Sequence, residues 1–175
     1  MTPDQVRGDR PAPIIVTAML GAEDQAWLDR QRTTHFPAGR NFLPAHLTMF
    51  HHLPPSLEGE VRQRLGDLAR GGRPAARIAG LISLGTGVAY RIDSDELEDK
   101  RACLADLWDG LLMPQDRAAW RPHVTIQNKV EPAKARAMLG QLQRDFRPRS
   151  LVIAGFASWW YRGGPWEPLS RHMCA

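Results

Sequence analysis

The sequence predicts an α+β fold in which two lobes, each built from strands and helices, face one another. Three observations support this prediction. Short β-branched runs alternate with longer segments whose apolar residues recur at helical spacing. Glycine and proline separate these segments along the chain. The strand–helix order of the first half recurs loosely in the second half, without a tandem repeat, which favours two similar layered units.

The first half is expected to hold four strands and two helices. The strands are the runs 14–20, 46–53, 77–84 and 88–92. A short helix over 22–31 follows the first strand. A second helix is expected to begin at Ser56, a good N-cap residue, and to end at Gly71-Gly72. The segment Gly85-Thr86-Gly87 predicts a hairpin between the last two strands.

The second half is expected to hold three strands and two helices. Asp93 or Ser94 can cap the first of these helices, and Pro114 is expected to end it. Pro132 opens the other helix at a position where proline is favoured. The strands are expected at 123–130, at 151–162 and, at an edge of the sheet, at 166–172.

Length and composition are those of one globular domain, residues 1–175, with a hydrophobic core. Of these residues 43% are hydrophobic and 24% are charged, and the formal net charge is +4. A modest basic excess favours an anionic partner, and arginine suits bidentate phosphate contacts. Almost all of the basic residues are arginines, for which an arginine-rich, solvated surface is the alternative explanation.

The sequence favours a protein of the cytoplasm. Its two cysteines, Cys103 and Cys174, form no disulfide framework or zinc pattern, which fits a reducing compartment. The segment Met1 to Pro13 is polar and contains prolines, unlike a signal or transit peptide. The longest apolar runs, such as 14–20, are far too short to span a membrane.

Two of the six histidines open matching tetrapeptides, HLTM at His46 and HVTI at His123. Both tetrapeptides lie on predicted strands. Because side chains alternate along a strand, each histidine shares a face with the threonine two residues later, and the aliphatic pair takes the other face. Two such strands side by side would bring two imidazoles and two hydroxyls into one groove. These motif residues are His46, Thr48, His123 and Thr125.

The motif residues suit phosphodiester chemistry. A neutral imidazole can take a proton from an attacking water or hydroxyl, and an imidazolium can give a proton to the leaving oxygen. Histidine has an unperturbed pKa of about 6.5, so both protonation states occur near neutral pH. Threonine hydroxyls can donate to the non-bridging phosphate oxygens and hold the phosphorus in line. We therefore predict an enzyme that requires neither a metal nor a cofactor.

The two stretches resemble the 2H phosphoesterase superfamily, which includes bacterial 2′-5′ RNA ligase-like proteins and RNA 2′,3′-cyclic phosphodiesterases. The specific similarity lies in residues 44–54 (PAHLTMFHHLP) and 121–127 (RPHVTIQ), and the order of elements extends it over most of the chain. The resemblance implies two pseudo-symmetric lobes with one motif each. Each lobe would be an antiparallel sheet with helices on its outer face, and a cleft would lie between them.

The resemblance also implies an activity, the hydrolysis of 2′,3′-cyclic phosphates, usually to 2′-phosphomonoesters, or of 2′-5′ linkages in RNA or nucleotides. Ligation would be a side or reverse reaction. By analogy we expect His123 to be the base and His46 the acid, although the sequence alone does not orient the pair. The expected partners are RNA ends or small nucleotides with a cyclic phosphate. We expect a monomer with no membrane contact and no obligate protein partner.

Several side chains near the motifs are candidates for substrate binding. Many relatives carry an arginine five positions after the second histidine, where this sequence has Asn128 followed by Lys129. On an unbroken strand, Gln127 and Lys129 would share the face of His123, and Lys129 could supply the missing cation. Phe50 would fall on the face of His46 and could stack on a base or pack in the core.

Three further candidates lie outside the tetrapeptides. Arg40 and Arg121 could contact phosphate, although most arginines of a basic protein are solvated. The cluster Trp159-Trp160-Tyr161 is split between the two faces of its strand, so at least one ring is expected in the core. Another, for which we select Trp160, could stack on a base.

Three alternatives remain open at the level of sequence. The first is a catalytically weak member of the same fold that binds RNA or nucleotides without turnover, which the absent arginine at position 128 favours. The second is an unrelated hydrolase with a metal bound by His46, His51 and His52, but no carboxylate or cysteine nearby completes a ligand set. The third is ligation on tRNA halves, which would use the same site.

Overall fold

A computed structural model describes residues 11–175, so residues 1–10 of the polar N-terminal segment lie outside the described part. The described residues form seven strands, five helices and two short 3₁₀ turns. In chain order these elements are β1 (Ile14–Leu20), α2 (Ala22–His35), η1 (Ala38–Arg40), β2 (Leu47–Leu53), η2 (Pro55–Leu57), α3 (Glu58–Arg70), β3 (Ala75–Ser83), β4 (Val88–Asp93), α4 (Asp95–Leu107), α5 (Pro114–Arg117), β5 (His123–Gln127), α6 (Pro132–Asp145), β6 (Arg149–Trp160) and β7 (Glu167–Met173).

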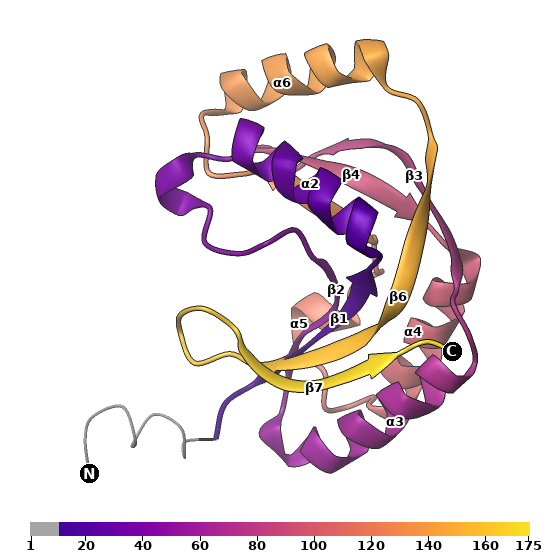
Figure 1. The fold of residues 1–175 in the computed structure, drawn as a ribbon. Helices are drawn as coiled ribbons and strands as arrows, with labels where there is room; N and C mark the ends of the chain where they lie inside the picture. The colour runs from indigo at the N-terminus through magenta and orange to yellow at the C-terminus, as the bar shows by residue number, and fades with distance from the viewer. Residues whose placement is uncertain (1–10) are drawn as a thin grey trace.

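All paired strands are antiparallel, in the order β2-β1-β6-β3-β4-β5, with β7 beside β6. The two halves of this sheet share β6, which Figure 1 shows as one long arc. The first part of β6, 149–152, pairs with β3. The rest, 153–160, pairs with β1, and 155–160 also pairs with β7. The predicted α+β fold is confirmed, and the two antiparallel units are continuous through β6.

The sheet curves so strongly that its two edges meet. β2 and β5 stand at opposite ends of the strand order, yet they contact each other. Strand twist allows this closure, because every added strand rotates the sheet further in the same sense. The two tetrapeptides lie at these two edges, one at each. The curvature of the sheet therefore brings together motif residues that are far apart in the sequence.

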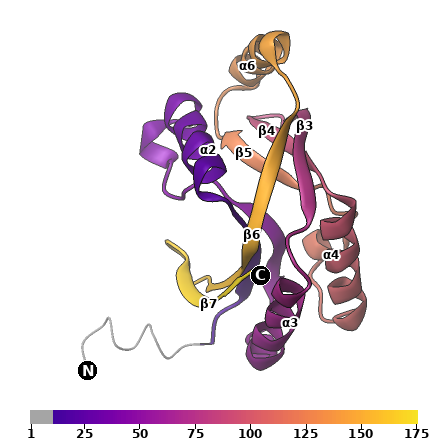
Figure 2. The same cartoon turned by 45° about the vertical axis from the view of Figure 1, so that its right-hand side comes forward.

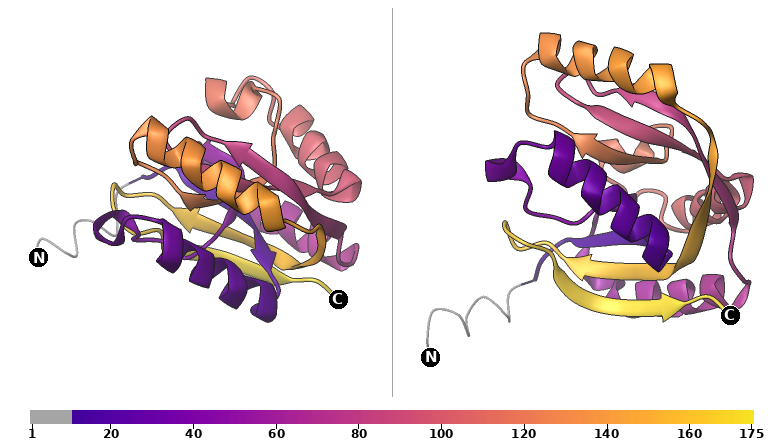
Figure 3. Two further views of the ribbon diagram at one scale, coloured as in Figure 1. Left: turned by 90° about the horizontal axis from the view of Figure 1, so that it is seen from above. Right: turned by 45° about the horizontal axis from the view of Figure 1, so that its top comes forward.

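The helices cover the sheet in two groups. α2 packs on β5, and α6 packs on β3 and β4. α3 packs on β6 and β7, α4 on β3 and α5 on β2. Figures 1 and 2 show α2 and α6 at one end of the molecule and α3 and α4 at the other. In the right-hand view of Figure 3, α2 lies between α6 and the hairpin of β6 and β7. No helix of residues 11–175 is long and apolar enough to cross a membrane.

Several predicted boundaries are confirmed. β1 spans the predicted residues, and β3 and β4 pair as the predicted hairpin. The Ser94 Oγ accepts a hydrogen bond from the Leu97 N–H at 3.1 Å and caps α4. Pro132 occupies the first turn of α6, where its missing N–H costs nothing.

Other boundaries were wrong for identifiable reasons. Ser56 caps no helix, because Pro54 and Pro55 direct the chain into a 3₁₀ turn and α3 begins only after Leu57. Pro114 does not end α4, which stops at Leu107, and instead opens the short α5. β5 ends at Gln127 rather than at residue 130.

Candidate active site

The two motif histidines are anchored in the same way. The Nδ1 atom of His46 lies 2.8 Å from the Pro44 carbonyl oxygen, and that of His123 lies 2.7 Å from the Arg121 carbonyl oxygen. In both cases the acceptor is the residue two positions earlier. When Nδ1 carries the proton, it donates to this carbonyl and leaves the Nε2 lone pair free. Both rings are thereby set to exchange protons through Nε2.

The alternation predicted for the tetrapeptides is confirmed. The aliphatic partners are fully buried in the core, whereas all four motif residues are half-buried. The buried partners are Leu47, Met49, Val124 and Ile126. Their burial fixes which face of each strand points away from the core. The imidazoles and hydroxyls therefore project from the edges where β2 and β5 meet.

Side chains, rather than a further strand, bind the free backbone groups of these two edges. The indole Nε1 of Trp120 donates to the Thr48 carbonyl oxygen at 3.1 Å. The guanidinium of Arg32, on α2, donates to the Thr125 carbonyl oxygen at 2.9 Å. Both carbonyls belong to motif threonines. These bonds fix the backbone on which the hydroxyls stand, and they occupy edge groups that would otherwise pair with another strand.

Arg32 also places a buried positive charge close to the site. Its Nε donates to the Asn41 Oδ1 at 3.0 Å, and its guanidinium lies 4.4 Å from the centroid of the Phe36 ring. Burial lowers the pKa of Arg32, and the nearby Asp29 partly offsets this. The charge of Arg32 in turn helps to lower the pKa of His46. The sequence contains no pattern that distinguishes Arg32 from its many other arginines.

The end of β2 beyond the motif is held by Asp116, a buried carboxylate of α5. The register against β1 shifts twice, so β2 contains irregularities that leave amides unpaired. The carboxylate of Asp116 accepts the backbone N–H of His51 at 2.8 Å and that of His52 at 2.9 Å. The His51 Nδ1 lies 3.1 Å from the same carboxylate. Burial alone would raise the pKa of Asp116, but these hydrogen bonds outweigh it and lower the pKa.

The metal site considered for His46, His51 and His52 is not assembled. The His51 ring pairs with Asp116, the His52 side chain is exposed, and His46 is bonded to the Pro44 carbonyl. Within residues 11–175, no three His, Cys, Asp or Glu side chains are grouped so that they could hold a metal ion.

The electrostatic environment of His46 favours the neutral imidazole. Burial lowers the pKa of His46 to about 4 and is the largest cause of the shift. The hydrogen bond to the Pro44 carbonyl opposes it, whereas the charges of Arg32, His123 and His51 add to it. At neutral pH and without a bound anion, His46 therefore carries no charge and its Nε2 can accept a proton.

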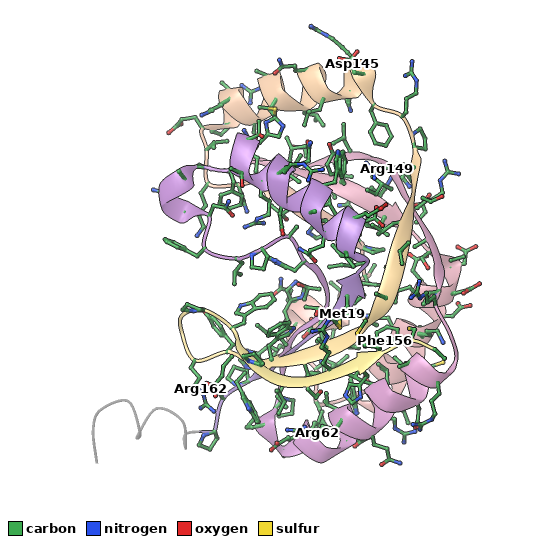
Figure 4. All side chains as sticks on the ribbon, in the orientation of Figure 1. Met19, Arg62, Asp145, Arg149, Phe156 and Arg162 are labelled. Atoms are coloured by element: carbon green, nitrogen blue, oxygen red, sulfur yellow. The ribbon has the colours of Figure 1, made fainter. Side chains whose placement is uncertain are left out.

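An apolar cavity of about 220 Å³ adjoins His46. Trp159 and Trp166 form part of its wall. Met19, labelled in the middle of the molecule in Figure 4, also lines it. The ring of Trp166 meets the His46 ring edge-on, with centroids 4.7 Å apart. Trp166 lies about 120 positions from His46, so no local pattern indicates it, and only the hairpin of β6 and β7 brings the two together.

Two of the predicted substrate contacts are core residues. Phe50 is 0% exposed and packs edge-on against Trp108, with centroids 5.2 Å apart. The register shift in β2 turns it into the core, so stacking on a base is excluded. Gln127 is also 0% exposed. A register shift between β4 and β5 places it opposite Val88, so the regular alternation that would put it on the face of His123 is interrupted.

The positions after β5 do not supply a cation to the His123 face. Lys129 has a φ of 60° and stands in the turn after the strand, so the assumption of an unbroken strand was wrong. The Asn128 Oδ1 accepts the Thr86 hydroxyl at 2.8 Å and the Lys129 N–H at 2.9 Å. Asn128 therefore closes a turn against the hairpin of β3 and β4. Arg40 is exposed and donates to the Lys129 carbonyl at 3.4 Å.

Arg121 and Trp160 also make contacts that the sequence did not predict. The carbonyl of Arg121 orients His123, and its side chain lines a separate cavity of about 200 Å³ in which neither motif histidine takes part. Trp160 packs against the hydrophobic core, with the Arg162 guanidinium 5.5 Å from its ring centroid. Its neighbour Trp159 is the ring that faces the cavity beside His46. Strand alternation separated the two tryptophans as predicted, and Trp159 is the one that lies beside His46.

Comparison with known proteins places this geometry in a family. The model of the 2′-5′ RNA ligase superfamily matches residues 21–165. No curated protein matches the chain. E. coli LigT complexed with 3′-AMP is similar in structure, with a TM-score of 0.64, 20% identity, and coverage of 95% of this chain and 99% of LigT.

Two further solved structures are similar. TT0787 of Thermus thermophilus has a TM-score of 0.60 and 16% identity, and the match covers 92% of this chain and 97% of TT0787. E. coli LigT complexed with NADP+ has a TM-score of 0.59 and 18% identity, and the match covers 94% of this chain and 99% of LigT. At these identities the likeness establishes the fold.

Proposed function

The chain belongs to the 2′-5′ RNA ligase superfamily, within the 2H phosphoesterases, and from this premise we propose that it hydrolyses 2′,3′-cyclic phosphates in RNA or nucleotides. One observation carries the proposal. His46 and His123 stand on the two sheet edges that meet, and each is anchored through Nδ1 to a carbonyl, so that both Nε2 atoms can exchange protons. Such a pair suits general acid–base catalysis.

The reaction follows from two proton transfers. A water oxygen attacks the phosphorus of the cyclic phosphate and gives its proton to the neutral histidine. The bond between phosphorus and the ribose 3′ oxygen breaks, and the protonated histidine gives its proton to that oxygen. The products are a 2′-phosphomonoester and a free 3′-hydroxyl. If the 5′-hydroxyl of a second strand attacks the cyclic phosphate in place of water, the same two proton transfers form a 2′-5′ phosphodiester and release the 3′-hydroxyl, so ligation uses the same groups.

The lowered pKa of His46 supports it as the base and His123 as the acid. This order is the reverse of the one expected by analogy from sequence. A base must be neutral in the resting enzyme, and burial holds His46 in that state. The fixed Thr48 and Thr125 hydroxyls would hold the non-bridging oxygens while charge develops on them. The buried charge of Arg32 lies close enough to stabilise the same anion in part.

The test is hydrolysis of 2′,3′-cyclic mononucleotides and of a short RNA with a cyclic end, in excess chelator, between pH 5 and 9. We expect turnover that survives the chelator and is lost in His46→Ala and in His123→Ala. His52→Ala is the matched control, because the His52 side chain is exposed and only its backbone is bonded to Asp116. Full activity of either motif variant would overturn the proposal.

The main alternative is a binding protein of the same fold without turnover. Its support is position 128, where many relatives carry an arginine and this chain uses Asn128 to close a turn. E. coli LigT has been solved with 3′-AMP and with NADP+, so nucleotides are suitable probes for both hypotheses. Tight binding of a cyclic nucleotide without product, in the same assay, would favour this alternative.

A further inference from the structure

Trp166 distinguishes the two motif histidines. Its ring contacts His46 edge-on, with an angle of 61° between the planes, and lies 6.3 Å from the ring of Trp159. The Trp159 indole N–H in turn donates to the Thr17 hydroxyl at 3.0 Å, which fixes this second ring on β1. Among residues 11–175, no aromatic ring is in comparable contact with His123.

We propose that Trp166 is a positioning residue that holds the His46 ring in place and keeps water away from it. The bond from Nδ1 to the Pro44 carbonyl fixes one point of the imidazole, and rotation about that bond would still be possible. The edge contact with Trp166 supplies a second fixed point. The catalytic consequence of this contact rests on the proposed function, whereas the contact itself does not.

The cavity behind this contact explains how one ring can exclude water. Most of its lining is apolar, and its polar side chains bond to protein groups. The Gln25 amide donates to the Ala45 carbonyl at 2.8 Å and to the Asp29 carboxylate at 3.0 Å, and the Thr17 hydroxyl is bonded to Trp159. Such a cavity offers water few hydrogen-bond partners. Removal of the indole would open His46 to solvent on this side.

The turn that carries Trp166 is built to hold a defined position. The Arg162 guanidinium donates to the Glu167 carboxylate at 2.9 Å across the base of the hairpin. Gly163 has a φ of 86°, a conformation that other residues rarely adopt, so the chain reverses here at little cost. Figure 4 labels Arg162 at this turn, on the side of the molecule away from α6. Trp166 is thus placed by a fixed hairpin.

The charges around His46 would remain when Trp166 is replaced. Arg32 and His51 lie on α2 and β2, and His123 lies on β5, so none of the three belongs to the hairpin. The carbonyl of Pro44 also remains. A changed titration of His46 in a Trp166 variant would therefore report on its exposure to water, and not on a lost charge.

The experiment is an NMR titration of histidine rings in the isotope-labelled full chain. We compare the native protein with Trp166→Ala, Trp166→Phe and the control Tyr161→Ala, which removes an exposed ring of the same hairpin. We expect Trp166→Ala to raise the pKa of His46 by about two units, toward its ordinary value. Trp166→Phe keeps an aromatic edge and should stay close to the native protein, as should Tyr161→Ala.

Activity gives a second readout on the same variants. A pKa raised toward about 6 leaves roughly a tenth of His46 neutral at pH 5, so kcat/KM of Trp166→Ala should fall about tenfold there and much less at pH 8. An equal fall at both pH values would indicate a merely structural defect and would overturn the proposal.

An unchanged His46 titration in folded Trp166→Ala would also overturn the proposal, as would an equal shift in Tyr161→Ala. If Trp166→Ala does not fold, Trp166→Gln and Trp166→Leu replace it, and only the polar variant should raise the pKa. A titration shift in a protein that turns over no cyclic phosphate would refute the proposed function while it supports the action of Trp166 on His46.

Discussion

The His46 and His123 sides of the site have the same tetrapeptide pattern and the same Nδ1 anchor, but different surroundings. His46 lies beside an apolar cavity and an indole, and the end of β2 is held by the buried Asp116 of α5, which binds backbone amides. His123 stands on a short strand that ends in a turn closed by Asn128. The similar tetrapeptides thus indicate the side chains and anchors that the two sides share, whereas the neighbours of each ring make the two sides unequal.

The largest expected effect tests the unequal roles directly. His46→Ala and His123→Ala should each lower kcat/KM on a 2′,3′-cyclic nucleotide by about 10²- to 10⁴-fold. On a p-nitrophenyl phosphodiester, whose leaving group needs no acid, His123→Ala should recover most of this loss and His46→Ala should not. Recovery in His46→Ala instead would reverse the assignment of base and acid.

Removal of Asp116 tests the stability of the His46 side. Asp116→Ala leaves the amides of His51 and His52 without their acceptor, and Asp116 is only 1% exposed. The free energy of unfolding should fall by about 2–4 kcal/mol, measured by urea denaturation. Asn128→Ala on the His123 side removes bonds of an exposed turn and should cost less than about 1 kcal/mol. Equal losses of stability in Asp116→Ala and Asn128→Ala would contradict the proposed difference between the two sides.

The lowered pKa of His46 predicts a loss of stability in mild acid. The unfolded chain binds a proton at His46 below about pH 6.5, whereas the folded protein binds one only near pH 4. Above about pH 6.5, His46 is neutral in both states and its burial does not lower the free energy of unfolding. As the pH falls from 6.5 toward 4, the free energy of unfolding decreases, by at most about 3 kcal/mol. The pKa values of His35 and His172 are also lowered by burial and act in the same direction.

A variant without the imidazole shows how much of this pH dependence of stability comes from His46. The drop in the free energy of unfolding between pH 7 and pH 5 should be smaller in His46→Gln than in the native protein, in parallel urea titrations. The same drop in both would show that burial of His46 has little effect on its protonation.

The smallest expected effect concerns the threonines, where the two sides should behave alike. Thr48→Val and Thr125→Val keep the shape of the side chain and remove a hydroxyl that would bind the phosphate. Each should lower kcat/KM by about tenfold to a hundredfold with little change in stability, because both side chains are half-buried. Full activity of one variant would restrict phosphate binding to the other motif.

The errors of sequence analysis at the site have a common physical cause. Alternation along an ideal strand placed Phe50 and Gln127 on the histidine faces, but register shifts interrupt the alternation and both side chains are buried. A register shift depends on the pairing partner, which a single strand does not reveal. Alternation also separated Trp159 from Trp160 without showing which of the two rings would lie beside His46.

The sequence by itself determined the α+β class, most of the elements and the two tetrapeptides, because local periodicity, turn residues and alternation depend only on neighbours in the chain. Tertiary structure alone decided that β2 and β5 meet, and that Arg32, Asp116 and Trp166 reach the motifs from α2, α5 and the last hairpin. These contacts depend on the curvature of the whole sheet. The depressed pKa of His46 follows from them, since burial is a property of the folded surroundings and not of the residue.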